Sequence, residues 1–176
     1  MRRTAILGLA VAAALAIAAP AARPDTGDAW LTTKVKIALL TAHDVSASAV
    51  NVDSDKGLVT IHGKVKTAEE KTKAEQVARG VDGVKEVKNL LQVVPESEKK
   101  VVAASDDKIK DGVQAALKSD KELDSVKVDA VDNGVVLLKG KTPDLGAKLK
   151  AIELTLATPG VKRVSSEIEA TETERK

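Results

Sequence analysis

A short apolar strand closed by glycines occurs twice in this chain. The first copy is GLVTIHG at 57–63 and the second is GVVLLKG at 134–140, so the numbering offset between them is 134 − 57 = 77. A later GVK-x-V marker at 83–87 recurs at the same offset at 160–164. Because one offset holds over this span, we interpret the chain as a tandem duplication of a small domain. Six glycines are expected to have structural roles at turns and helix ends, namely Gly57, Gly63, Gly83, Gly134, Gly140 and Gly160.

Residues 1–21 have the pattern of a secretory signal peptide. Arg2 and Arg3 precede an apolar run from Ala5 to Ala19, and small residues follow at 19–21. The run is shorter than the roughly 20 apolar residues that a spanning helix needs. The chain has no cysteine, which excludes both a disulfide and a lipid-bearing cysteine. We therefore expect residues 1–21 to be removed on export and the rest to be a soluble periplasmic protein.

Charge argues against a nucleic-acid partner. The chain has 28 basic and 26 acidic side chains, and loss of Arg2 and Arg3 leaves 28 − 2 = 26 basic ones, hence no net charge. There is no basic block, and Trp30 is the only aromatic residue for base stacking. Hydrophobic residues make up 43% of the chain, which is enough for packed cores. We expect a monomer with no nucleic-acid partner.

Residues 28–94 are predicted to form the first domain, in the order helix, strand, strand, helix, strand. Asp28 is the expected N-cap of the first helix, and residues 67–70 read as a capping box for the second. Residues 53–57 are expected to form the turn of a hairpin, and Pro95 is expected to end the last strand. The predicted core faces of the two helices are Leu31, Val35, Ala38, Leu39 and Ala42, and then Ala74, Val77, Ala78 and Val81.

The second domain is predicted at 105–170, after a linker at 95–104 and before a tail at 171–176. Asp106 or Asp107 is the expected cap of its first helix. Thr142 and Pro143 are expected to start the second helix. The predicted core face of that helix is Leu145, Leu149, Ile152 and Leu156.

Both repeats therefore predict an α+β fold, with two tandem domains that each have two helices over a three-stranded sheet. The helices leave one face of each sheet uncovered, and we expect the domains to pack through these faces. The side chains predicted there are Leu58, Thr60 and His62 in the first repeat and Val135, Leu137 and Lys139 in the second.

The paired turn-strand segments DKGLVTIHG and DNGVVLLKG, the GVK-x-V marker and the helix start DAWLTTKV resemble the BON domain family. The resemblance covers about residues 28–169 and both repeats. It implies phospholipid-surface contact and a chaperone-like or stress-protective role in the periplasm, including osmotic stress. It brings no catalytic residues or cofactor.

The residues themselves give no sign of catalysis or of a metal site. His43 and His62 have no second ligand at metal-binding spacing, and we expect both to be ordinary surface residues. Four aspartates near the turns could suggest calcium, but no glutamate completes such a loop. These aspartates, Asp53, Asp55, Asp129 and Asp132, are interpreted as turn residues.

Two classes of function stay open, a module that binds membrane phospholipid and a holdase for unfolded envelope proteins. A third is a structural partner for another envelope protein. The candidate lipid-binding residues are Trp30, Lys34, Lys36 and Ile37, because tryptophan and lysine on an exposed helix face suit a lipid interface. The alternative is that Trp30 caps the end of the first domain or packs into the contact between the domains.

Overall fold

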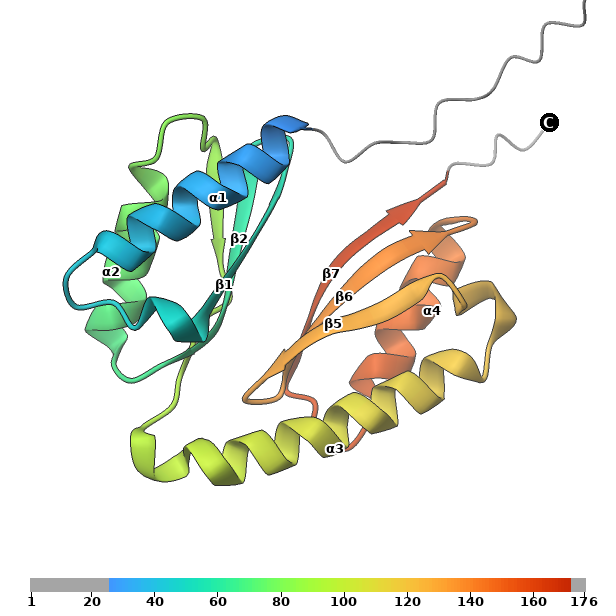
Figure 1. Cartoon of the computed structure of the whole chain (residues 1–176). Helices are drawn as coiled ribbons and strands as arrows, with labels where there is room; N and C mark the ends of the chain where they lie inside the picture. The colour runs from blue at the N-terminus through green and yellow to red at the C-terminus, as the bar shows by residue number, and fades with distance from the viewer. Residues whose placement is uncertain (1–25, 172–176) are drawn as a thin grey trace, which may run out of the picture.

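The computed structural model describes residues 26–171, which form two domains of the same topology (Figure 1). The predicted signal peptide and residues 172–176 lie outside this range. No helix within residues 26–171 is both long and apolar enough to cross a bilayer. The predicted α+β class is confirmed.

In the first domain, β2 is the central strand of the sheet. Its elements are α1 (Thr26–Thr41), β1 (Val50–Asp55), β2 (Leu58–Val65), α2 (Ala68–Arg79), β3 (Glu86–Asn89) and β4 (Gln92–Val93). β1 pairs with β2 antiparallel, and β3 and β4 both pair with β2 in parallel. The third strand is thus split into two short pieces.

The second domain repeats this plan with an unbroken third strand. Its elements are α3 (Lys99–Lys118), β5 (Val126–Asp132), β6 (Val135–Thr142), α4 (Leu145–Leu156) and β7 (Arg163–Ala170). β6 is central, antiparallel to β5 and parallel to β7. In Figure 1 the two sheets face each other, and the helices lie on the outer sides.

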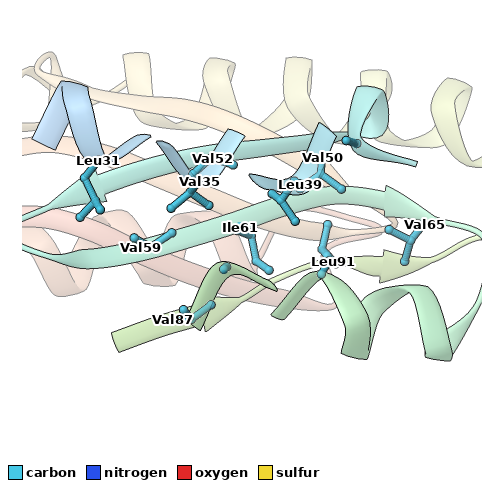
Figure 2. Close-up of a cluster of buried hydrophobic side chains, with 13 residues drawn as sticks. Leu31, Val35, Leu39, Val50, Val52, Val59, Ile61, Val65, Val87 and Leu91 are labelled. Atoms are coloured by element: carbon cyan, nitrogen blue, oxygen red, sulfur yellow. The ribbon is translucent and has the colours of Figure 1, made fainter. Parts of the chain in front are cut away.

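Each domain has its own apolar core between its helices and its sheet. In the first, Leu31, Val35 and Leu39 of α1 lie over the inward side chains of the strands (Figure 2). Those strand residues include Val50, Val52, Val59, Ile61 and Val87. In the second core the matching α3 residues are Ile109, Val113 and Leu117, so helical periodicity placed these faces correctly.

Asp28 and Asp106 hold the hairpin turns and do not cap helices, which corrects the prediction. The Asp28 carboxylate accepts hydrogen bonds from the backbone N–H groups of Lys56 (2.9 Å) and Gly57 (3.4 Å). The Asp106 carboxylate accepts the equivalent pair from residues 133 and 134, both at 2.9 Å. These turn amides have no ladder partner, so a carboxylate from the helix satisfies them.

The helix boundaries also differ from two predictions. α3 begins at Lys99, inside the predicted linker 95–104, because residues 99–105 contain no helix breaker. α4 is capped by Asp144 and not by Thr142, since the Asp144 carboxylate accepts from the Ala147 N–H at 2.8 Å.

The predicted core face of α4 is wrong. Ala147, Ala151 and Thr155 are the α4 residues buried against the sheet. Leu145, Leu149 and Leu156 are 61%, 57% and 52% exposed, and Ile152 is half-buried. Small side chains let the helix lie close to the strands, so the larger leucines point outward.

Gly63 and Gly140 sit at the same tight approach in the two domains. Their φ angles are 128° and 139°, in the region that favours glycine. A Cβ at Gly63 would lie 2.1 Å from the Ala49 carbonyl oxygen, and one at Gly140 would lie 2.1 Å from that of Ser125. The other four glycines predicted to have structural roles also have positive φ.

Candidate functional site

The outer face of α1 carries an exposed apolar row. Trp30 is 62% exposed, and Ile37 and Leu40 are also more than half exposed. They lie on the side of α1 opposite the core face, and their helical spacing keeps them in line. Leu40 was missed in the sequence analysis, although its spacing from Ile37 is the signal that would have found it.

The structure separates the two predicted lysines. Lys34 lies beside the row, where its Nζ donates to the Asp82 carbonyl at 3.3 Å and lies 3.9 Å from the Asp82 carboxylate. Lys36 lies on the other flank of α1, and its Nζ donates to the carbonyl of Val50. Lys34 therefore shares a surface with Trp30, whereas Lys36 supports the contact between α1 and β1.

An open hollow of about 410 Å³ adjoins Trp30. Its charged lining residues are Lys34, Lys56, Lys85, Asp28 and Asp82, and Gly57 and Gly83 form part of its floor. Three ammonium groups against two carboxylates give the hollow a net charge of 3 − 2 = +1. An indole beside a basic hollow can contact an apolar chain and an anionic group together.

The second domain lacks this combination. At the helix numbering offset of 109 − 31 = 78, Trp30, Ile37 and Leu40 correspond to Lys108, Ala115 and Lys118. The α1 row therefore belongs to one copy, although the backbone is repeated.

A second polar site lies where the two sheets face each other. The Thr60 hydroxyl donates to the Glu167 carboxylate at 2.7 Å, and Thr60, Val135 and Leu137 are buried. The predicted contact through the uncovered sheet faces is therefore confirmed. It also excludes Trp30 from the contact formed by the two sheets, since Trp30 lies on α1, on the outer side of the first sheet (Figure 1).

His62 lies at the centre of this contact and is only 7% exposed, so the prediction of a surface residue is wrong. Its Nε2 is 3.2 Å from Asp53 and 3.9 Å from Asp129, and its Nδ1 is 3.4 Å from Asp132. Burial alone would lower the pKa of His62, but hydrogen bonds to Asp132 and Asp53 raise it to about 9. The hydrogen bond from His62 in turn lowers the pKa of Asp53 to about 2. His62 is therefore a cation that bridges the two domains at neutral pH.

Lysines complete the bridge. Lys64 of β2 lies 2.9 Å from Asp106 and 3.6 Å from Asp132. Lys139 of β6 lies 2.9 Å from Asp53 across the contact. A further pair links Lys88 to Glu167 at 3.6 Å. Burial alone would lower the pKa of Lys64, but its bonds to Asp106 outweigh this and raise the pKa above its ordinary value.

Asp129 reaches the contact through a β-bulge found in the second domain. The β5 ladder skips this residue between Val128 and Ala130, whereas the β1 ladder is regular. The repeat offset changes across it, from 126 − 50 = 76 before the bulge to 132 − 55 = 77 after it. The extra residue, Asp129, therefore adds a carboxylate to the contact, and the regular β1 ladder has no residue at the equivalent place.

Asp53, His62 and Asp129 lie close enough to hold a metal ion, with donor atoms within 4.8 Å of one another. The Lys139 ammonium, however, lies 2.9 Å from Asp53 and 3.0 Å from Asp129, where it forms an ion pair with each carboxylate. The four aspartates interpreted as turn residues, Asp55 included, lie in β1 and β5. Asp53, Asp129 and Asp132 bind across or beside the contact. The arrangement favours a structural ion-pair network over a metal centre.

Comparison with known proteins gives a family match over both repeats. The family model described as BON domain matches residues 27–95 and 105–172. The chain is also 32% identical over 144 residues to Osmotically-inducible protein Y of Escherichia coli (strain K12). That alignment covers 80% of this chain and 71% of the relative.

Solved structures give a weaker likeness. Two structures of CdsD, a structural protein of the type III secretion system of Chlamydia trachomatis, are 12% identical, with TM-scores of 0.32 and 0.31. Each match covers 80% of this chain but only 64% and 60% of those chains, so the chain spans less than two thirds of their length. A likeness of this degree says nothing about function.

Proposed function

The chain belongs to the BON domain family, and from this premise we propose that it is a non-enzymatic, stress-protective protein of the periplasm that contacts phospholipid surfaces through α1. The name of its E. coli relative supports a role under osmotic stress. Its first domain would supply the contact, because the apolar row is present there and absent from the equivalent face of α3.

The observation that carries the proposal is the exposure of Trp30 in line with Ile37 and Leu40. A large apolar row on the surface of a soluble domain marks an interaction site. Tryptophan prefers the headgroup level of a bilayer, with apolar neighbours inserted below it. The hollow with Lys34, Lys56 and Lys85 would then face the phosphate groups.

The strength of this contact follows from its few charges. Each lysine near an anionic surface contributes about 1 kcal/mol, and salt screens it. Binding should therefore be weak, selective for anionic lipid and lost as salt is raised.

Fluorescence tests the proposal directly, since Trp30 is the sole tryptophan. We expect its emission to shift to the blue with anionic vesicles at low salt. Replacing Ile37 and Leu40 together by glutamine should abolish the shift and leave the reporter in place. Val101→Gln is the matched control, because Val101 is an exposed apolar residue on α3. An unchanged wild-type spectrum in excess anionic vesicles would refute the proposal.

The alternative is a holdase that binds unfolded envelope proteins through the same apolar row. Unlike lipid contact, such binding would not need the basic hollow. Lys85→Glu should therefore weaken vesicle flotation but leave suppression of client aggregation unchanged. Lys162→Glu is the matched control, because Lys162 occupies the equivalent position in the second domain (85 + 77 = 162).

A further inference from the structure

α4 carries a second exposed apolar row, on the opposite domain from Trp30. Leu145, Leu149 and Leu156 are each more than half exposed, and Ile152 is half-buried between them. Their alternating i,i+4 and i,i+3 spacing places all four side chains on one face of the helix. This is the a/d spacing by which helices pair in coiled coils.

The fold itself does not require this row. At the numbering offset of 77, its members correspond to Ala68, Thr72, Glu75 and Arg79 of α2. In α2 the last two form an ion pair at 2.7 Å and keep that surface polar. The row is therefore a property of the second domain, and an exposed patch of this kind marks a contact with another molecule.

Two charges flank the row on opposite sides. Lys148 precedes Leu149, and Glu153 follows Ile152, which places Lys148 at the g position of one heptad and Glu153 at the e position of the next. Neither side chain has an ion-pair partner within residues 26–171, whereas Lys150 on the far side of α4 is paired with Asp120. The row thus has one unused charge of each sign along its two edges.

We propose that α4 is a self-association surface, on which a second copy of this chain docks with its own α4 parallel to the first. In a parallel helix pair, a g residue meets the e residue five positions later on the partner, so Lys148 meets the partner's Glu153 on both edges. In an antiparallel pair, like charges would meet along each edge. The charges therefore select the parallel arrangement.

The dimer is weak and depends on concentration. Four apolar side chains per copy bury less than the roughly 800 Å² per partner of a standard interface. This proposal does not depend on lipid contact, which uses α1. It differs from the expectation of a monomer stated in the sequence analysis.

Sedimentation equilibrium over a wide range of protein concentration tests the proposal. Wild-type protein should show a monomer–dimer equilibrium, and Leu149→Glu should remain monomeric with an unchanged melting temperature. Thr72→Glu is the matched control on α2, and it should dimerise like the wild type. Lys148→Glu and Glu153→Lys should each weaken the dimer by about tenfold.

The double variant that carries both charge reversals should regain wild-type association, because the two charges exchange roles across the parallel pair. Failure of this rescue would overturn the parallel arrangement. A wild-type protein that stays monomeric at every concentration would overturn the proposal as a whole. The proposal would also be overturned if Leu149→Glu lost binding to vesicles or to unfolded clients while its mass in sedimentation stayed equal to that of the wild type. The α4 row would then bind lipid or a client and not a second copy of the chain.

Discussion

Replacement of His62 by glutamine should remove the pH dependence of the contact between the domains. The amide keeps a polar group beside Asp132 but carries no charge. In the wild type, His62 faces Asp53 of β1 and Asp129 and Asp132 of β5, with Lys139 of β6 nearby. The ring is a shared cation for carboxylates of both domains, and the variant leaves them with one positive charge fewer.

The size of the effect follows from the pKa. The rise from 6.5 to about 9 corresponds, at about 1.4 kcal/mol per unit, to at most about 3.5 kcal/mol. His62 is buried, but Asp53 and Asp129 are partly exposed, so solvent reduces their share. We expect His62→Gln to lower the free energy of unfolding by about 2 kcal/mol at neutral pH.

The sign of the pH dependence is fixed because the folded protein holds the proton more tightly. The stabilisation is complete below the unfolded pKa of 6.5 and is lost as pH rises through about 9. Urea unfolding of the wild type and of His62→Gln at a series of pH values would measure this stabilisation. The contributions of His43 and of the lysines are present in both proteins and are removed when the two free energies of unfolding are subtracted. A difference that stays constant across this window, or a His62 NMR titration centred near 6.5, would refute the reasoning.

Three further predictions concern single residues. Gly63→Ala should lower the free energy of unfolding by about 3 kcal/mol or more, because its Cβ meets a carbonyl oxygen, whereas Gly80→Ala at φ −77° should change little in the same urea titration. Leu137→Lys should separate the domains and raise the radius of gyration in X-ray scattering with both cores intact, and an unchanged radius would count against the sheet contact. Asp106→Asn should lower the free energy of unfolding by about 1 kcal/mol more than Asp28→Asn does, because of these two residues only Asp106 also binds a lysine of the other domain. This extra loss should become smaller in high salt. An excess that is insensitive to salt would contradict the ion-pair account.

The presence of the hairpins and the α1 and α3 core faces could be predicted because each depends on local chemistry that the repeat shows twice, but the first turn is shorter than the predicted 53–57, since β1 extends to Asp55. The α4 face could not be predicted from periodicity alone, since that helix has two stripes and the more apolar one points outward. The repeat itself held the answer, because Ala74 of α2 corresponds to Ala151 of α4 (74 + 77 = 151). The stripe of smaller side chains faces the sheet because the helix lies close to the strands there and leaves no room for leucine.

The ion-pair network could be predicted only in part. Strand alternation placed His62 on the uncovered face beside Thr60, but its partners Asp129 and Asp132 come from a different domain. A local sequence pattern cannot show that residues so far apart in the chain are in contact. The residue types around Asp129 also do not predict the bulge. The environment of His62 therefore depends on how the sheets meet.

The charges in the contact are sorted by domain. The first domain supplies His62, Lys64 and Lys88, and the second supplies Asp106, Asp129, Asp132 and Glu167, with Lys139 and Asp53 as the one reversed pair. A first domain is therefore complementary to a second domain but not to another copy of itself. The two domains are joined by a short hinge at residues 95–98, between the end of the first domain at Val94 and the start of α3 at Lys99. If that short hinge straightened, two chains could exchange domains and rebuild the same contact twice, so one interface would serve both a closed chain and a swapped pair.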